Sequence, residues 1–151
     1  MIISSALTAF DWKNIMTALV IAYIATLIAF VGIDAVWLGR MADVIYRPAM
    51  GDMLLDTFRA GPAVVFYLIF AGGLVYFAVR PAMVQGDVTT ALINGAVLGF
   101  VAYATYDLTN HATLKNWTTF LTVADMGWGT ILSAASASIG YLVVTALTKS
   151  T

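Results

Sequence analysis

Four polar side chains crowd into nine residues near the end of a strongly apolar segment. They belong to the stretch YATYDLTNHATLKNW, residues 103–117, and are Asp107, Asn110, His111 and Lys115. If a helix continues through this stretch, Tyr103, Asp107 and His111 share one face, because residues four apart lie above one another. Asn110 then lies beside that face. A carboxylate and the only histidine of the chain at such a place predict a site for binding or for proton chemistry.

Two further acids, Asp34 and Asp125, also lie inside apolar segments. At 1.5 Å per helical residue, these two and Asp107 lie about 9–12 Å from the same end of the predicted bundle. An ionised carboxylate near the bilayer centre costs about 2.5–3.5 kcal/mol, so each acid is expected to face inward and to have a partner. The candidate partners are Arg40, His111, Lys115, Asn110 and the hydroxyls of Tyr103 and Tyr106.

A short pattern occurs twice, as Asp34-Ala-Val-Trp37 and as Asp125-Met-Gly-Trp128. Residues three apart in a helix are neighbours, so the pattern sets each acid beside an indole. The indole N–H can then satisfy the acid, or the ring can cover a bound group. Trp37 and Trp128 therefore join the candidate site.

The composition predicts which kind of protein must position these residues. Hydrophobic residues make up 62% of the 151 residues and charged residues 10%, against roughly 45–50% and 25% in soluble domains. Too few charges remain to cover a water-facing surface, so we expect an integral membrane protein with one domain, residues 1–151. No basic run is present, which excludes nucleic acid as a partner. The absence of cysteine excludes disulfides and thiolate chemistry.

The hydropathy pattern predicts an all-α, four-helix membrane bundle. Each of four apolar stretches is long enough to cross a hydrocarbon core of about 30 Å, at residues 14–38, 62–79, 89–108 and 120–147. Gly39-Arg40 is expected to end the first span and Arg80-Pro81 the second. The connection between them reads either as a short interfacial helix, with Met50, Met53, Leu54 and Phe58 on its apolar face, or as a loop. An even number of spans places both termini on one side.

Small residues predict where these helices pack closely. Gly95 and Gly99 form a small-xxx-small pattern in the third span, and residues 133–140 of the fourth are almost all small. Such residues let helix backbones approach in lipid. We expect the fourth span to face other helices, in this chain or in a second copy.

The chain resembles a bacterial family of predicted inner-membrane proteins that carries no assigned activity, a domain-of-unknown-function family. The resemblance is carried by Asp34-Ala-Val-Trp37-Leu-Gly39, Phe66-Tyr67, Gly99, Tyr103-Ala-Thr-Tyr106-Asp107-Leu-Thr-Asn110 with Ala112-Thr-Leu114, and Asp125-x-x-Trp128-Gly129. It implies a four-span protein of the bacterial inner membrane.

Three functions fit these residues. The first is an intramembrane site that binds a cation, a proton or a small lipid-soluble ligand. The second is proton- or cation-coupled transport by a homo-oligomer. The third is a structural or assembly subunit of a larger membrane complex.

Crowded acids repel, so at least one is expected to hold a proton at neutral pH. Oxygen ligands favour Mg²⁺, Mn²⁺ or Ca²⁺, and a site that includes His111 would suit Zn²⁺ or Fe²⁺. The candidate residues are Asp34, Asp107, Asp125, Asn110, His111, Tyr103, Tyr106, Trp37 and Trp128. No motif decides whether the protein is an enzyme.

Overall fold

The computed structural model describes residues 12–55 and 57–148, and of Trp12 and Lys13 only the backbone. Its regular structure is helical within these residues, and four segments are long and apolar enough to cross a membrane: Asn14–Met53, Ala60–Gln85, Val88–Thr113 and Thr119–Thr148. The predicted four-helix membrane bundle is confirmed. The helices also extend beyond the predicted spans at several ends.

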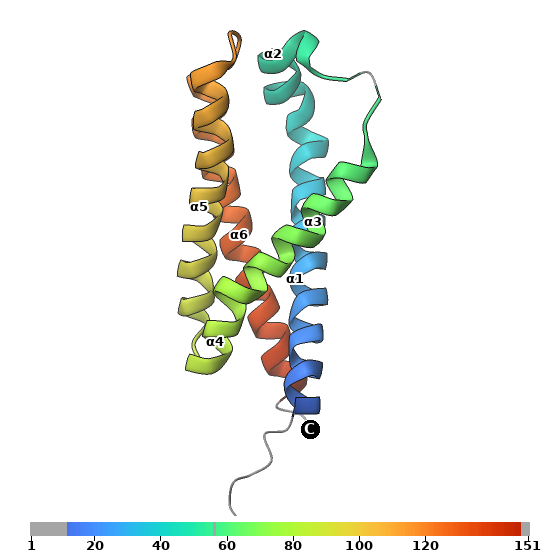
Figure 1. Cartoon of the computed structure of the whole chain (residues 1–151), viewed down its shortest axis with the longest axis vertical. Helices are drawn as coiled ribbons and strands as arrows, with labels where there is room; N and C mark the ends of the chain where they lie inside the picture. Colours follow the sequence, from blue (N-terminus) through green and yellow to red (C-terminus); the bar gives the residue numbers. More distant parts are fainter. Residues whose placement is uncertain (1–11, 56, 149–151) are drawn as a thin grey trace, which may run out of the picture.

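The bundle is arranged around the last helix. Helices α1 (Trp12–Met41) and α5 (Val88–Thr113) both pack along α6 (Thr119–Thr148). Helix α3 (Ala60–Leu74) crosses α1 diagonally on the near face and leads to α4 (Arg80–Gln85) beside the lower part of α5 (Figure 1). The first and last helical residues lie at the same end of the bundle (Figure 1). Because α3 is tilted, the upper part of this face between α1 and α5 has no helix in front of it.

Glycines bring α5 and α6 into direct backbone contact. A side chain at Gly95 or Gly99 would collide with the backbone of α6, where the carbonyl oxygens of Ser133 and Gly129 lie. On the other side of α6, Gly140 leaves room only for Thr26 of α1. Within this chain the small residues therefore face other helices, as the sequence predicts.

Pro48 and Pro81 do not end the helical segments in which they lie. Pro48 lies in α2 (Arg47–Met50) and Pro81 in α4, and each helix is preceded by one π-helical turn, η1 (Ala42–Tyr46) or η3 (Val75–Val79). A proline has no N–H and clashes with the carbonyl four residues earlier, and the wider π turn accommodates that clash. The helices therefore continue past Gly39-Arg40 and Arg80-Pro81, where the first and second spans were predicted to end.

A neighbouring helix satisfies one of the carbonyls that a proline leaves without its usual partner. Pro81 cannot donate to Phe77, four residues before it, and the Asn94 side chain of α5 donates to the Phe77 carbonyl at 3.2 Å. This bond ties the π turn of the second span to the third. It also explains why an amide is tolerated in an apolar helix.

A non-helical loop follows the first segment, and the N-terminus of α5 is capped by a side chain. A 3-10 turn, η2 (Gly51–Met53), ends the first segment, and the described residues from Leu54 to Arg59 are not helical, so the loop alternative holds there. Asp87 caps α5 by accepting a hydrogen bond from the Thr89 backbone N–H at 3.0 Å. That bond holds the pKa of the Asp87 carboxyl below its ordinary value.

Candidate functional site

Asp34 of α1 is buried and accepts hydrogen bonds from two other helices. The Tyr67 hydroxyl of α3 donates to Oδ2 at 2.7 Å, and the Trp128 indole of α6 donates to Oδ1 at 3.0 Å. The predicted partner Arg40 is exposed and does not bond it. Both oxygens of Asp34 are thus used to join three helices.

A chain of two hydrogen bonds orients Asp125 of α6. The Tyr46 hydroxyl donates to Asp125 Oδ1 in a short hydrogen bond, and the Trp37 indole donates to the Tyr46 hydroxyl at 3.0 Å. Tyr46 is the last residue of η1. The π turn required by Pro48 therefore belongs to the same short segment that brings this hydroxyl to Asp125.

The two Asp-x-x-Trp patterns are connected crosswise. The Trp37 and Trp128 rings stack with centroids 4.2 Å apart and planes 7° from parallel. Each indole is connected to the acid of the other pattern. Trp128 donates directly to Asp34, whereas Trp37 donates to the Tyr46 hydroxyl, which in turn donates to Asp125. Of the two alternatives that the sequence left open, an indole N–H bonded to the acid of its own pattern is not what the structure shows, because α1 and α6 pack with the two patterns at one level. We call Asp34, Tyr67, Trp128, Trp37, Tyr46 and Asp125 the aspartate–indole network.

Asp107 of α5 is in a different situation. Its side chain is fully buried, and neither carboxylate oxygen has a hydrogen-bond partner among the residues that the structure describes. Asp107 lies close enough to Asp125 for their two charges to interact. Asp125 lies equally within range of the charge of Asp34. The predicted partner Lys115 is exposed.

Replacing Asp107 by Asn is expected to raise the free energy of unfolding by about 1 kcal/mol, because it removes a buried group that repels Asp125 when ionised. Thermal unfolding of the two proteins in the same detergent measures the change. Asp43→Asn is the control, since Asp43 is exposed and pairs with Arg47 at 2.7 Å on the surface. A marked fall in the stability of Asp107→Asn would show instead that the native carboxylate holds a bound partner.

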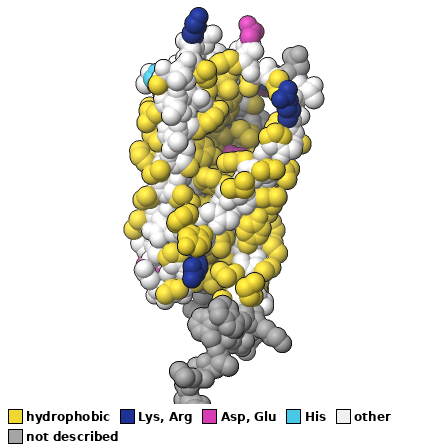
Figure 2. Space-filling model, in the orientation of Figure 1, with side chains coloured by type: hydrophobic (Ala, Val, Ile, Leu, Met, Phe, Trp, Pro, Cys, Tyr) yellow, Lys and Arg dark blue, Asp and Glu magenta, His cyan; other side chains and the backbone are white. Residues whose placement is uncertain are grey.

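A cavity of about 340 Å³ opens beside Asp125. Its lining residues come from α3, α5 and α6, and they are Phe66, Phe70, Ala102, Tyr103, Tyr106 and Asp125. Figure 2 shows the corresponding face hollowed above the crossing of α3, with acidic atoms at the bottom of the hollow. The hollow opens on the side of the bundle, where lipid would lie (Figure 2).

The rest of the predicted site is only partly assembled. Tyr103 and Tyr106 line the cavity, and the Asn110 side chain lies near the Tyr106 hydroxyl. His111 is exposed, although it follows the buried Asp107 by one turn. Within the described residues, no three side chains of the ligand types His, Cys, Asp and Glu gather as a metal site would need. The predicted metal set of Asp34, Asp107, Asp125 and His111 is therefore not brought together there.

Two residues of the network, Tyr46 and Tyr67, were missed as site residues. Tyr67 lies in the Phe66-Tyr67 pair that carries part of the family resemblance, so a signal for it existed. Tyr46 lies in the connection after the first predicted span, where no periodicity marks it. Only the continuation of that helix brings its hydroxyl to Asp125.

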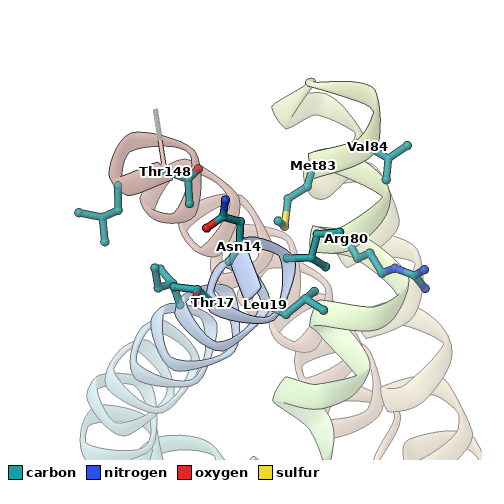
Figure 3. Close-up of a pocket in the computed structure, with 11 residues that line it drawn as sticks. Asn14, Thr17, Leu19, Arg80, Met83, Val84 and Thr148 are labelled. Atoms are coloured by element: carbon teal, nitrogen blue, oxygen red, sulfur yellow. The ribbon is translucent and has the colours of Figure 1, made fainter. Parts of the chain in front are cut away.

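A second and larger cavity, of about 850 Å³, lies at the opposite end of the bundle between α1, α4 and α6. Figure 3 shows Asn14, Thr17 and Thr148 on one side of it and the Arg80 side chain extending away from them. Its described lining is mainly apolar and contains no acid. None of the predicted site residues lies there.

One comparison with known proteins agrees that this is a membrane protein. A family model with the description "Predicted membrane protein (DUF2177)" matches residues 19–142, which include both Asp-x-x-Trp patterns and the whole of the cavity lining. No curated protein and no solved structure matches the chain.

Proposed function

The chain belongs to the DUF2177 family of predicted membrane proteins, and we propose that it binds a small ligand dissolved in the bilayer. The ligand enters from the side of the bundle and occupies the cavity between α3, α5 and α6, with its polar group against Asp125. We place the protein in the bacterial inner membrane with both termini on the same side.

The observation that carries this proposal is a carboxylate at the base of an aromatic cavity. Small-molecule sites are concave, largely apolar, about 300–1,000 Å³ in volume, and contain a few placed polar groups. The cavity of about 340 Å³ falls in that range, and Asp125 is the only acid among the described residues that line it. An empty cavity of this kind would leave a carboxylate facing hydrocarbon, which a bound polar group relieves.

The aspartate–indole network supports the proposal because it fixes the orientation of that carboxylate. Tyr46 holds Oδ1 and leaves Oδ2 without a hydrogen-bond partner among the described residues. Tyr46 is in turn held by Trp37, whose ring is stacked on Trp128. When the contacts around a polar group already fix its orientation, that group loses less conformational entropy on binding a ligand.

The test is the chemical content of the purified protein. Mass spectrometry of an organic extract is expected to find a small molecule that co-purifies with the native protein and is at least tenfold depleted from Asp125→Asn. Asp43→Asn makes the same chemical change at an exposed site and is expected to retain the molecule in full. Equal retention by all three proteins, or a molecule in none, would overturn the proposal.

A further inference from the structure

We propose that the ligand of the side cavity is an amphiphilic organic cation: an ammonium group that lies between Asp125 and the aromatic rings, joined to an apolar chain that extends into the bilayer. The inference rests on the proposed function and specifies the chemical class of its ligand.

The charge around the cavity is of one sign. Asp125 lines it, and Asp107 and Asp34 lie close enough for their charges to act on Asp125. None of the described Lys or Arg side chains is part of the lining. Arg40 and Lys115 are exposed, and Arg47 is exposed and pairs with Asp43. In a medium of low dielectric constant this arrangement attracts a cation and repels an anion strongly.

The aromatic lining favours an organic cation over a metal ion. Phe66, Phe70, Tyr103 and Tyr106 supply four rings, with Phe70 and Tyr103 set edge to face at 6.4 Å. Ring faces attract ammonium groups, most strongly where water is excluded. A metal ion would instead require several oxygen ligands, about six to eight for Ca²⁺, and the described lining contains one carboxylate, that of Asp125.

A neutral ligand satisfies the site less well. A hydroxyl donates one hydrogen bond to Asp125 and leaves the carboxylate charge uncompensated beside hydrocarbon. A quaternary or protonated amine neutralises that charge and at the same time covers the rings. The side opening gives its chain a direct path to the lipid (Figure 2).

The experiment compares three probes of equal chain length with the native protein in lipid nanodiscs. They are decyltrimethylammonium, its uncharged carbon isostere 2,2-dimethyldodecane, and decyl sulfate, and their occupancy is read by native mass spectrometry. The cation is expected to bind at least tenfold more tightly than the isostere, and decyl sulfate more weakly than either. Asp125→Asn is expected to remove the preference for the cation.

Aromatic variants give a second and independent measurement. Tyr106→Phe keeps a ring and is expected to keep most of the affinity, whereas Tyr106→Leu is expected to lose it at least fivefold. Phe120→Leu, at an exposed ring outside the cavity, is the matched control. Binding of the isostere as tightly as the cation would overturn this inference and leave the proposed function standing. Binding of none of the three probes, in a protein that also retains no small molecule, would overturn both.

Discussion

Alanine at Gly99 or at Gly129 is expected to lower the free energy of unfolding by about 3 kcal/mol or more, the upper end of the usual cost of overpacking. A methyl group at Gly99 would overlap the Gly129 carbonyl oxygen and lie 2.5 Å from the Ser133 hydroxyl. The carbonyl is backbone and cannot rotate away. The methyl group can fit only if α5 moves away from α6.

Gly127 provides the control in the same helix. A methyl group there meets nothing within 4 Å, so Gly127→Ala is expected to be neutral or to stabilise by up to about 1 kcal/mol through helix propensity. Thermal unfolding of the variants in one detergent measures the difference.

The two destabilised variants also differ in how they can be rescued. A methyl group at Gly129 meets the Tyr103 ring, which is a side chain. Tyr103→Ala should therefore recover part of the stability of Gly129→Ala, whereas Ser133→Ala should recover little for Gly99→Ala. Unfolding of Gly99→Ala within two degrees of the native protein would contradict the packing of α5 on α6.

The number and type of the helices could be predicted from sequence because lipid leaves little choice. A chain with 62% hydrophobic residues and four long apolar stretches can satisfy its backbone groups in a bilayer only as helices. The helix ends were less predictable. Proline and arginine usually mark an end, but here π turns before Pro48 and Pro81 let both helices continue, and a π turn leaves no signature in hydropathy.

The acids of the site were predictable as positions, but their partners were not. An aspartate within an apolar span is conspicuous, and counting along helices places Asp34 and Asp125 at one level. Which hydroxyl or indole reaches each acid depends on how the helices rotate about their axes, and that is decided by side-chain packing between distant segments. Tyr67 and Asp34 are 33 residues apart, and Tyr46 and Asp125 are 79 apart. For His111 the position on the helix was predictable but its burial was not. It lies one turn after the buried Asp107 on the same face of α5, and that face is exposed at the end of the helix.

Replacing Asp34 by Ala is expected to lower the free energy of unfolding by about 2–6 kcal/mol, because it leaves two partly buried donors without an acceptor at about 1–3 kcal/mol each. The donors are the Tyr67 hydroxyl and the Trp128 indole, from α3 and α6. Thermal or denaturant unfolding in detergent measures the loss. In the Asp34→Ala variant, the further change Tyr67→Phe should lower the free energy of unfolding by less than it does in the native protein. The Tyr67 hydroxyl has already lost its acceptor in that variant.

Asp34→Asn separates hydrogen bonding from charge at the same position. The amide oxygen can accept from Trp128 while the amide nitrogen donates to the Tyr67 hydroxyl, which can also accept. Most of the stability should therefore remain, and an Asn variant as unstable as the Ala variant would show that the charge itself is required.

The same substitution at Asp125 is expected to spare the fold and to lose the proposed ligand. The two acids begin the same four-residue pattern, yet one has both oxygens committed to neighbouring helices and the other has one oxygen free beside a cavity. That difference in geometry is why we propose a structural role for Asp34 and a binding role for Asp125.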